Sequence, residues 1–273
     1  MNTAKSTLLL AALTGLFLVV GEALGGRGGL VLGLLMAGVM NFVSYFWSDT
    51  LVLRAYSAQP VDPQQAPQLY EVVQQLALKA RIPVPRMYVI PDPALNAFAT
   101  GRNPQHAAVA VTEGLLRALD REELEGVLAH ELSHVLNRDT LTSTIAATLA
   151  GAISFSARMA LFRRDERGGG WGGLLTVLLA PLAALLIQLA VSRSREFEAD
   201  ASGARVAGNP DGLVRALRTL QAAAEEVPLP ANPASAHLFI VNPLSGRGLS
   251  GLFSTHPPLE ERIARLLGRP ATG

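Results

Sequence analysis

Three residues near the middle of the chain have the types and the spacing of a metal-dependent hydrolytic site. His130, Glu131 and His134 form an H-E-x-x-H motif inside Leu124–Asn137, which reads LEGVLAHELSHVLN. In a helix, histidines four residues apart lie one turn apart on the same side, and they can give two nitrogen ligands to one tetrahedral zinc ion. Glu131 falls in the apolar stripe of this helix, where a carboxylate is costly unless it has a partner. A zinc-bound water is such a partner, so Glu131 is the predicted general base.

A zinc ion held by two histidines needs one further protein ligand and one open position. The sequence has no cysteine and only five histidines, so a carboxylate on a second helix is expected. Ser192–Asp200, SRSREFEAD, offers Glu196, Glu198 and Asp200. Glu196 and Asp200 share one helix face and Glu198 points elsewhere, so the spacing leaves either of the first two as the ligand. The alternative interpretation is the solvated, charged beginning of a helix.

The composition of the chain indicates a membrane protein. Charged residues make up 16% of the sequence, against roughly 25% in an ordinary soluble domain, and apolar residues are concentrated in blocks. The formal net charge of +1 argues against a nucleic-acid partner. The absence of cysteine excludes disulfides, thiolate metal ligands and a thiol nucleophile.

Two uncharged blocks at the start of the chain predict a helical hairpin in a lipid bilayer. Residues 6–21 are short for a membrane span, and residues 28–48 are long enough. The second block ends in aromatic residues, which is typical of the headgroup region. A cleaved signal peptide is the competing interpretation, but no small-x-small cleavage site with a polar continuation follows the first block.

Two further apolar blocks separate the motif from the predicted third ligand. Residues 140–157 are uncharged but rich in Ser and Thr. Residues 168–192 are also uncharged, and Leu174–Val191 within them are strongly apolar with a kink expected at Pro181. A second membrane hairpin over 140–191 is favoured over a buried pair of core helices. The prediction is therefore a mainly α membrane protein with a zincin-like α+β catalytic domain and four transmembrane or membrane-associated helices.

The segment between the first hairpin and the motif reads as the first part of a soluble domain. An amphipathic helix is expected over Pro67–Ala80, and strands over Arg86–Ile90 and Ala107–Val111. Helix N-caps are expected at Thr112 and Asp120, the second in a capping box with Glu123. Beyond the third-ligand segment, a helix pair over Gly203–Ala224 broken at Gly208-Asn209-Pro210, a long loop over Val227–Leu252 and a terminal helix over Leu259–Leu267 are expected. We take the loop as a candidate flap over the substrate.

Four motifs together resemble the HtpX-type membrane zinc metalloproteases, in the superfamily of the CAAX-prenyl endoprotease. They are H-E-x-x-H, the later E-x-x-A-D beginning at Glu196, NAFATG upstream at Asn96–Gly101 and FSTHPP downstream. The resemblance implies one zinc ion per chain with Glu196 as its third ligand, and Asp200 as the carboxylate that orients a ligating histidine. His256 resembles the histidine of the family's HPP motif, which stabilises the oxyanion; the alternative is a histidine that only adjoins a helix cap. His237 and His106 stay unassigned.

The predicted substrates are polypeptides that bind in extended form. A substrate strand added beside NAFATG would contact Asn96, Ala97 and Phe98. The resemblance implies degradation of misfolded or damaged membrane proteins, as part of quality control and the stress response. Two alternatives are a processing protease that cuts one defined substrate, such as a prenylated tail, and a non-catalytic membrane scaffold with a structural zinc ion. A structural site needs no general base, so the intact motif argues against the scaffold.

The predicted domain organisation has four parts: a transmembrane hairpin (1–48), the first part of the catalytic domain (49–139), a second membrane hairpin (140–191) and the second part of the catalytic domain (192–273). The expected location is the bacterial inner membrane with the catalytic domain in the cytoplasm. Five basic residues flank the apolar blocks on the side of the catalytic domain and favour this orientation, although the basic turn Arg163–Arg167 opposes it. They are Lys5, Arg54, Arg138, Arg193 and Arg195.

Overall fold

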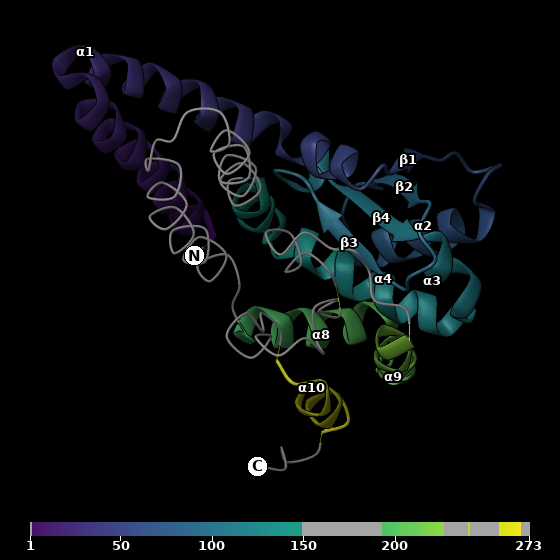
Figure 1. Cartoon of the computed structure of the whole chain (residues 1–273). Helices are drawn as coiled ribbons and strands as arrows, with labels where there is room; N and C mark the ends of the chain where they lie inside the picture. Colours follow the sequence, from purple (N-terminus) through teal and green to yellow (C-terminus); the bar gives the residue numbers. More distant parts are fainter. Residues whose placement is uncertain (1, 149–192, 227–239, 241–256, 269–273) are drawn as a thin grey trace.

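The computed structural model describes residues 2–148, 193–226, 240 and 257–268, and within them the chain is mostly helical with one small sheet (Figure 1). A further helical stretch covers residues 140–148. The elements in chain order are α1 (Asn2–Ala55), β1 (Gln59–Pro60), α2 (Pro67–Ala80), β2 (Arg86–Ile90), β3 (Ala97–Thr100), a short 3-10 helix η1 (Pro104–His106), β4 (Ala108–Thr112), α3 (Glu113–Ala118), α4 (Arg121–Leu136), α8 (Arg193–Ala207), α9 (Asp211–Glu226) and α10 (Leu259–Leu266).

Helix α1 is a hairpin of two helical arms, as the two apolar blocks predict. The backbone leaves the helical conformation at Gly25 and Gly26, and Gly26 has a φ of 55°, which favours glycine. The arms then approach so closely that a Cβ atom on Gly21 would lie 2.3 Å from the carbonyl oxygen of Gly29. Small residues that let two backbones touch are typical of helix pairs in membranes. Figure 1 shows the two arms side by side, projecting away from the sheet.

One arm of this hairpin has the length of a membrane span. The helix over Gly25–Ala55 is long and apolar enough to cross a bilayer, whereas the apolar stretch Ser6–Val19 is shorter than a span. Large apolar side chains on the longer arm, such as Leu35 and Trp47, are exposed. Of the second predicted hairpin, only residues 140–148 belong to the described part of the chain, and 149–192 lie outside it. The described residues therefore show one spanning candidate where the sequence predicts four membrane helices.

The sheet has four strands in the order β1-β2-β4-β3. Strands β2 and β4 are parallel, with Met87 opposite Val109, and the two outer strands are antiparallel to their neighbours. The strand predicted at Arg86–Ile90 is confirmed, and the one predicted at Ala107–Val111 is displaced by one residue. Strand β3 lies at one edge of the sheet, which makes its backbone available to groups outside the sheet.

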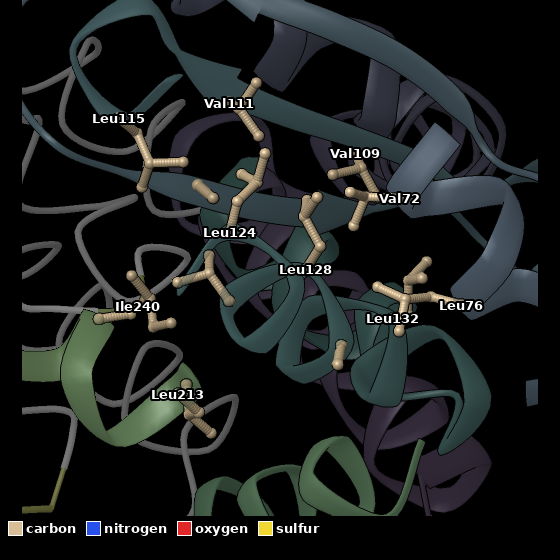
Figure 2. Close-up of a cluster of buried hydrophobic side chains, with 14 of the residues drawn as sticks. Val72, Leu76, Val109, Val111, Leu115, Leu124, Leu128, Leu132, Leu213 and Ile240 are labelled. Atoms are coloured by element: carbon tan, nitrogen blue, oxygen red, sulfur yellow. The ribbon is translucent and has the colours of Figure 1, made fainter. Parts of the chain in front are cut away.

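One face of the sheet packs against α2 and α4. Figure 2 shows this core, in which Val109 of β4 faces the apolar side chains of α2 and α4. Leu76 and Leu128 are fully buried there, and burial of one such side chain contributes roughly 1.5–3 kcal/mol. Because α4 has apolar neighbours on both sides, the sheet above it and α8 and α9 below it (Figure 1), the helix is fixed at the centre of the domain.

The opposite face of the sheet packs against the end of α1. Val52 and Leu53 lie in one apolar cluster with Ile90 and Phe98, and the ring of Tyr56 is 5.8 Å from that of Phe98. Strand β3 is tied to the helical stretch 140–148 by a hydrogen bond of 2.9 Å between the hydroxyls of Thr100 and Thr144. The sheet therefore contacts the end of α1, which is the first predicted membrane hairpin, and also the described beginning of the second.

Helices α8 and α9 are separated at Gly208–Pro210 as predicted, but α8 begins at Arg193, before the expected start of the pair at Gly203, and α9 ends at Glu226. Both approach α4 at glycine residues. A Cβ atom on Gly203 of α8 would lie 2.9 Å from the amide nitrogen of His130, and one on Gly126 of α4 would lie 2.3 Å from that of Leu213. These close approaches bring α8 directly across the H-E-x-x-H segment. The terminal helix α10 confirms the prediction over Leu259–Leu267 within one residue.

Candidate metal centre

The H-E-x-x-H motif lies on α4, and the beginning of this helix is fixed by the predicted capping box. The carboxylate of Asp120 accepts a hydrogen bond of 2.8 Å from the amide of Glu123, and the Glu123 carboxylate accepts one of 3.0 Å from the amide of Asp120. Such a cap stabilises a helix by about 1 kcal/mol. With the register of α4 set in this way, His130 and His134 present their rings on one face, with ring centroids 4.8 Å apart.

Helix α8 brings a carboxylate to the two imidazoles. The Nε2 atoms of His130 and His134 are 3.3 Å apart. Each of them is 3.7 Å from a different oxygen of Glu196. Glu196 and His130 are buried, and His134 is partly exposed, so the cluster opens toward solvent on the side of His134.

These three donors fit a tetrahedral metal ion. Two ligands at 2.0–2.1 Å from a tetrahedral zinc ion are about 3.3 Å apart, close to the observed 3.3 and 3.7 Å. All three donor atoms lie within 4.8 Å of one another. Two imidazole nitrogens and one carboxylate oxygen are also the donor set of many catalytic zinc sites, which leave the fourth position open.

Each histidine has a carboxylate at its other ring nitrogen. Asp200 Oδ1 is 2.9 Å from Nδ1 of His130, and Asp139 Oδ2 is 3.3 Å from Nδ1 of His134. A carboxylate at Nδ1 holds the proton on that nitrogen, so that Nε2 keeps its lone pair for a metal ion. The side chain of Glu198 is exposed, as its position on the other face of the helix predicts.

Asp139 has no part in the sequence predictions, although a signal for it exists. It follows His134 by five residues and sits where α4 ends, and its amide donates a hydrogen bond of 2.9 Å to the carbonyl of His134. An acidic residue directly beyond the second histidine can fold back onto that histidine. Arg195, counted above among the membrane-flanking charges, is buried near Asp139 and Glu196 instead, where its charge offsets theirs.

A second residue that the predictions omit is Arg262 of α10, whose side chain is fully buried. Its guanidinium donates hydrogen bonds of 2.8 and 2.7 Å to the two oxygens of Asp200. Nothing in the local sequence distinguishes Arg262 from the exposed Arg265 on the same helix.

The carboxylate of Glu131 is held by the edge of the sheet. Its Oε2 accepts a hydrogen bond of 2.8 Å from the amide of Ala99 in β3. The amide of Ala99 points away from β4 and binds Glu131 instead. This hydrogen bond links the edge strand β3 to α4 at the predicted general base. The carboxylate is 3% exposed, so it is shielded from bulk water.

The residues predicted to contact substrate lie in or next to β3, and all three are buried. Asn96 binds the amide of Ala97 through its side chain at 3.0 Å and the amide of Thr112 through its carbonyl at 2.9 Å. Phe98 packs under the end of α1. The side chains of Asn96 and Phe98 therefore hold the strand in place, whereas the backbone edge of β3 lies next to Glu131.

Three other histidines were named from the sequence. His256 and His237 lie outside the described residues, as does the predicted flap over Val227–Leu252 except for the buried Ile240. His106 is on η1, where its Nδ1 is 2.8 Å from the side-chain oxygen of Asn103. It is exposed and belongs to a turn.

Comparison with known proteins gives the family. Residues 63–270 match Peptidase family M48, over a range that contains both histidines, Glu131 and Glu196. The chain belongs to peptidase family M48. This M48 chain is 55% identical to a "Protease HtpX homolog" of Desulfatibacillum aliphaticivorans, over 100% of its own length and 91% of the relative. A protein of the same description from Salinibacter ruber is 55% identical over 97% of each chain. The family resemblance stated from the motifs is confirmed, and with it the predicted enzyme class, a metalloprotease.

Among solved structures, the M48 chain is similar to S. mikatae Ste24p. The TM-score is 0.54 at 20% sequence identity, and the match covers 97% of the chain and 65% of Ste24p. At this level of identity the likeness concerns the fold. It extends over nearly the whole length of the chain.

The charges in the M48 site affect one another strongly. Burial raises the pKa of Glu131 to about 8, and the nearby Glu196 adds to this effect. Burial opposes the charged form of His134, but Asp139, Glu196 and Glu131 outweigh it and raise the pKa of this histidine to about 9. Burial likewise opposes the charge of Asp200, and Arg262 outweighs it, so that the pKa of Asp200 falls to about 2.

These pKa values predict that metal ions stabilise the M48 chain more at high pH. Without metal, the folded state binds more protons than the unfolded state, because the pKa of Glu131 is raised from 4.5 and that of His134 from 6.5. The free energy of unfolding of the metal-free protein therefore falls as the pH rises from about 6 to 9. A metal dication takes the place of these protons. We expect the difference in melting temperature between zinc-loaded and metal-free protein to widen over this range, and a constant difference contradicts the prediction.

Proposed function

We propose that this M48 protease is an endopeptidase with one catalytic zinc ion, held by His130, His134 and Glu196, and with Glu131 as its general base. The observation that carries the proposal is the convergence of three donor atoms at the spacing of tetrahedral ligands. Zinc is favoured among the metals because two imidazoles and one glutamate are the donor set of hydrolytic zinc sites, and peptide hydrolysis needs a Lewis acid without redox chemistry. The carboxylates at both Nδ1 atoms support the same assignment.

The bound metal supplies Lewis acidity, which lowers the pKa of a coordinated water to about 7 and polarises the scissile carbonyl. The protein residues supply the proton transfers. Glu131 accepts the proton of the attacking water and later donates it to the leaving amine. The hydrogen bond from the amide of Ala99 holds this carboxylate in place, and its burial shields it from bulk water.

Substrate is proposed to bind in extended form along β3. The contacts would come from the backbone carbonyls of Ala97 and Ala99, because the amides of these two residues already bind Asn96 and Glu131. Asn96 and Phe98 would hold the strand in position. Strand addition at a sheet edge gives affinity that depends little on the substrate's side chains. The hydrogen bond from Ala99 to Glu131 supports this binding mode, because it places the edge strand beside the proposed general base.

The hairpin α1 is proposed to hold the enzyme in a bilayer, with the second hairpin over 140–191 completing four membrane helices. Support comes from the spanning length of Gly25–Ala55 and its exposed apolar side chains. The proposed location is the bacterial inner membrane with the site on the cytoplasmic side, and the proposed substrates are misfolded or damaged membrane proteins. Because the end of α1 packs on the sheet that carries β3, the site would lie at a constant height above the bilayer.

Metal removal tests the proposed chemistry. We expect the detergent-solubilised full-length protein to cleave casein, to lose this activity when a chelator strips the metal, and to regain it with one equivalent of zinc. Magnesium is expected to restore little activity, because it prefers six oxygen ligands. Metal content is measured on the same samples. Undiminished cleavage by protein that holds no metal contradicts the proposal, and so does a zinc-loaded protein that cleaves nothing.

The substrate class needs a separate assay. A panel of unfolded membrane proteins, unfolded soluble proteins, their folded forms and a prenylated peptide is incubated with the active enzyme in detergent or vesicles. A quality-control protease is expected to cleave most unfolded members at many sites and to spare the folded ones. Cleavage of the prenylated peptide alone, at one bond, would show a processing enzyme instead.

A further inference from the structure

Arg262 is unusual among the charged residues of the described chain because its side chain has no contact with solvent. A buried guanidinium is costly unless its donors are paired and an opposite charge lies close by. Arg265, one turn further along α10, shows the ordinary case: its side chain is 54% exposed and pairs with Glu261 at 2.9 Å. The burial of Arg262 therefore calls for a specific explanation.

All three nitrogens of the Arg262 guanidinium have partners. Nε and Nη2 donate to the two oxygens of Asp200 at 2.8 and 2.7 Å. Nη1 donates to the carbonyl of Ile240 at 3.0 Å. A two-pronged contact of this kind fixes the plane of a carboxylate as well as its position. The terminal helix thus holds a residue of α8 that lies 62 positions earlier in the chain.

The oriented carboxylate of Asp200 faces His130. Its Oδ1 accepts from Arg262 and is also 2.9 Å from Nδ1 of His130. The guanidinium itself is 3.5 Å from the same ring nitrogen. Arg262 is a permanent donor, so Asp200 beside it stays an acceptor. The Nδ1 atom of His130 must then carry the proton, and Nε2, which faces His134 and Glu196, keeps its lone pair.

Without Arg262, the carboxylate of Asp200 would lose its fixed orientation toward His130. A carboxylate bound at one oxygen can turn about its side-chain bonds. Nδ1 of His130 would then have no acceptor in a fixed position, and the imidazole would be free to turn its Nε2 atom away from the metal. The orientation and tautomer of a ligating imidazole set metal affinity, and loss of the group that fixes them costs about 10–100-fold.

We propose that Arg262 is a positioning residue of the metal centre, which acts through Asp200 to keep Nε2 of His130 free and aimed at the metal. The inference rests on the proposed role of His130 as a ligand. It makes the terminal helix α10 part of the metal centre, through a residue that is not one of the three proposed ligands. The C-terminal segment then contributes to metal affinity as well as to folding.

The test compares metal affinity in the full-length, metal-stripped protein in detergent. Zn²⁺ affinity is measured by competition with a chelating dye, and the absorption spectrum of the Co²⁺-loaded protein reports the ligand geometry. We expect Arg262→Met to lower Zn²⁺ affinity about 10–100-fold and to change the Co²⁺ spectrum, with Arg262→Lys in between. Glu260→Gln, at an exposed position of the same helix, is the control and is expected to leave both unchanged.

A double variant separates positioning from folding. Arg262→Met alone leaves Asp200 as an unpaired buried charge and can unfold the protein, whereas Asp200→Asn with Arg262→Met leaves no charge in that pair. If Arg262 acts through Asp200, adding Arg262→Met to Asp200→Asn lowers the affinity no further. Additive losses overturn the inference, and so does wild-type affinity in Arg262→Met. A wild-type chain that binds no metal overturns the proposed function itself, and the inference with it.

Discussion

Glu131→Gln is expected to lower the rate of casein cleavage by about 10²–10⁴-fold, the usual contribution of a general base, while zinc content stays at the wild-type level. Glutamine has the shape of glutamate, and its side-chain oxygen can accept the hydrogen bond that Glu131 takes from Ala99. It cannot accept a proton from water. The three donor atoms on His130, His134 and Glu196 are untouched, so the metal site stays intact.

The variant also reports on stability. Burial raises the pKa of Glu131 to about 8, so the carboxylate form is disfavoured in the metal-free protein. A neutral amide avoids this cost, and we expect metal-free Glu131→Gln to melt no lower than the wild type at pH 9. Melting is followed by circular dichroism. Glu125→Gln on the same helix, where Glu125 pairs with Lys79 at the surface, is the control and is expected to keep full activity. Cleavage at the wild-type rate by Glu131→Gln would remove Glu131 from the mechanism.

Gly203→Val is expected to abolish zinc binding and to destabilise the domain by about 1–3 kcal/mol or more. A Cβ atom at this position would lie 2.9 Å from the amide nitrogen and 3.0 Å from the Cα atom of His130. Neither helix backbone can yield locally, so α8 must move away from α4. Glu196 and Asp200 are on α8, and both would be drawn from the histidines together. Zinc binding by dye competition and melting temperature measure the two effects.

Ala201→Val is the matched control for this variant, because Ala201 lies on the exposed side of the same helix. It adds the same β-branched side chain to α8 and should cost only the small difference in helix propensity. We expect its zinc affinity to equal that of the wild type. Unchanged zinc binding in Gly203→Val would show that the α4–α8 distance does not set the site.

Much of the catalytic domain is predictable from local sequence. Pro67–Ala80 has the periodicity of an amphipathic helix and forms one with those bounds, and Asp120 with Glu123 caps α4 as its spacing predicts. These features depend on residues close together in the chain, where helix geometry decides which side chains meet. The small strand β1 has no such pattern, and only its pairing with β2 gives it an extended form.

In the membrane part, too, the local sequence predicts the helices, and tertiary contacts decide where they attach. The two uncharged blocks predict two helical arms, and glycines at the bend and along the contact give the hairpin of α1. Composition cannot say where the hairpin attaches. That is decided by the packing of Val52 and Leu53 on the far face of the sheet, a contact between segments about 40 residues apart.

For the metal centre, the sequence likewise determines the local arrangement on each helix, and the tertiary structure decides how the helices meet. The sequence by itself determined that His130, Glu131 and His134 lie close together on one helix, and that Glu196 and Asp200 share a face of another. Helix spacing treats those two carboxylates alike. The resemblance of the motifs assigned Glu196 as the ligand and Asp200 as the orienting carboxylate, and the tertiary structure supplies the physical reason. The close contact at Gly203 sets α8 at a position where Glu196 reaches both Nε2 atoms and Asp200 reaches Nδ1 of His130. Arg262 entered the site for the same reason, because its role depends on how α10 packs against α8, and the sequence of neither helix determines that packing.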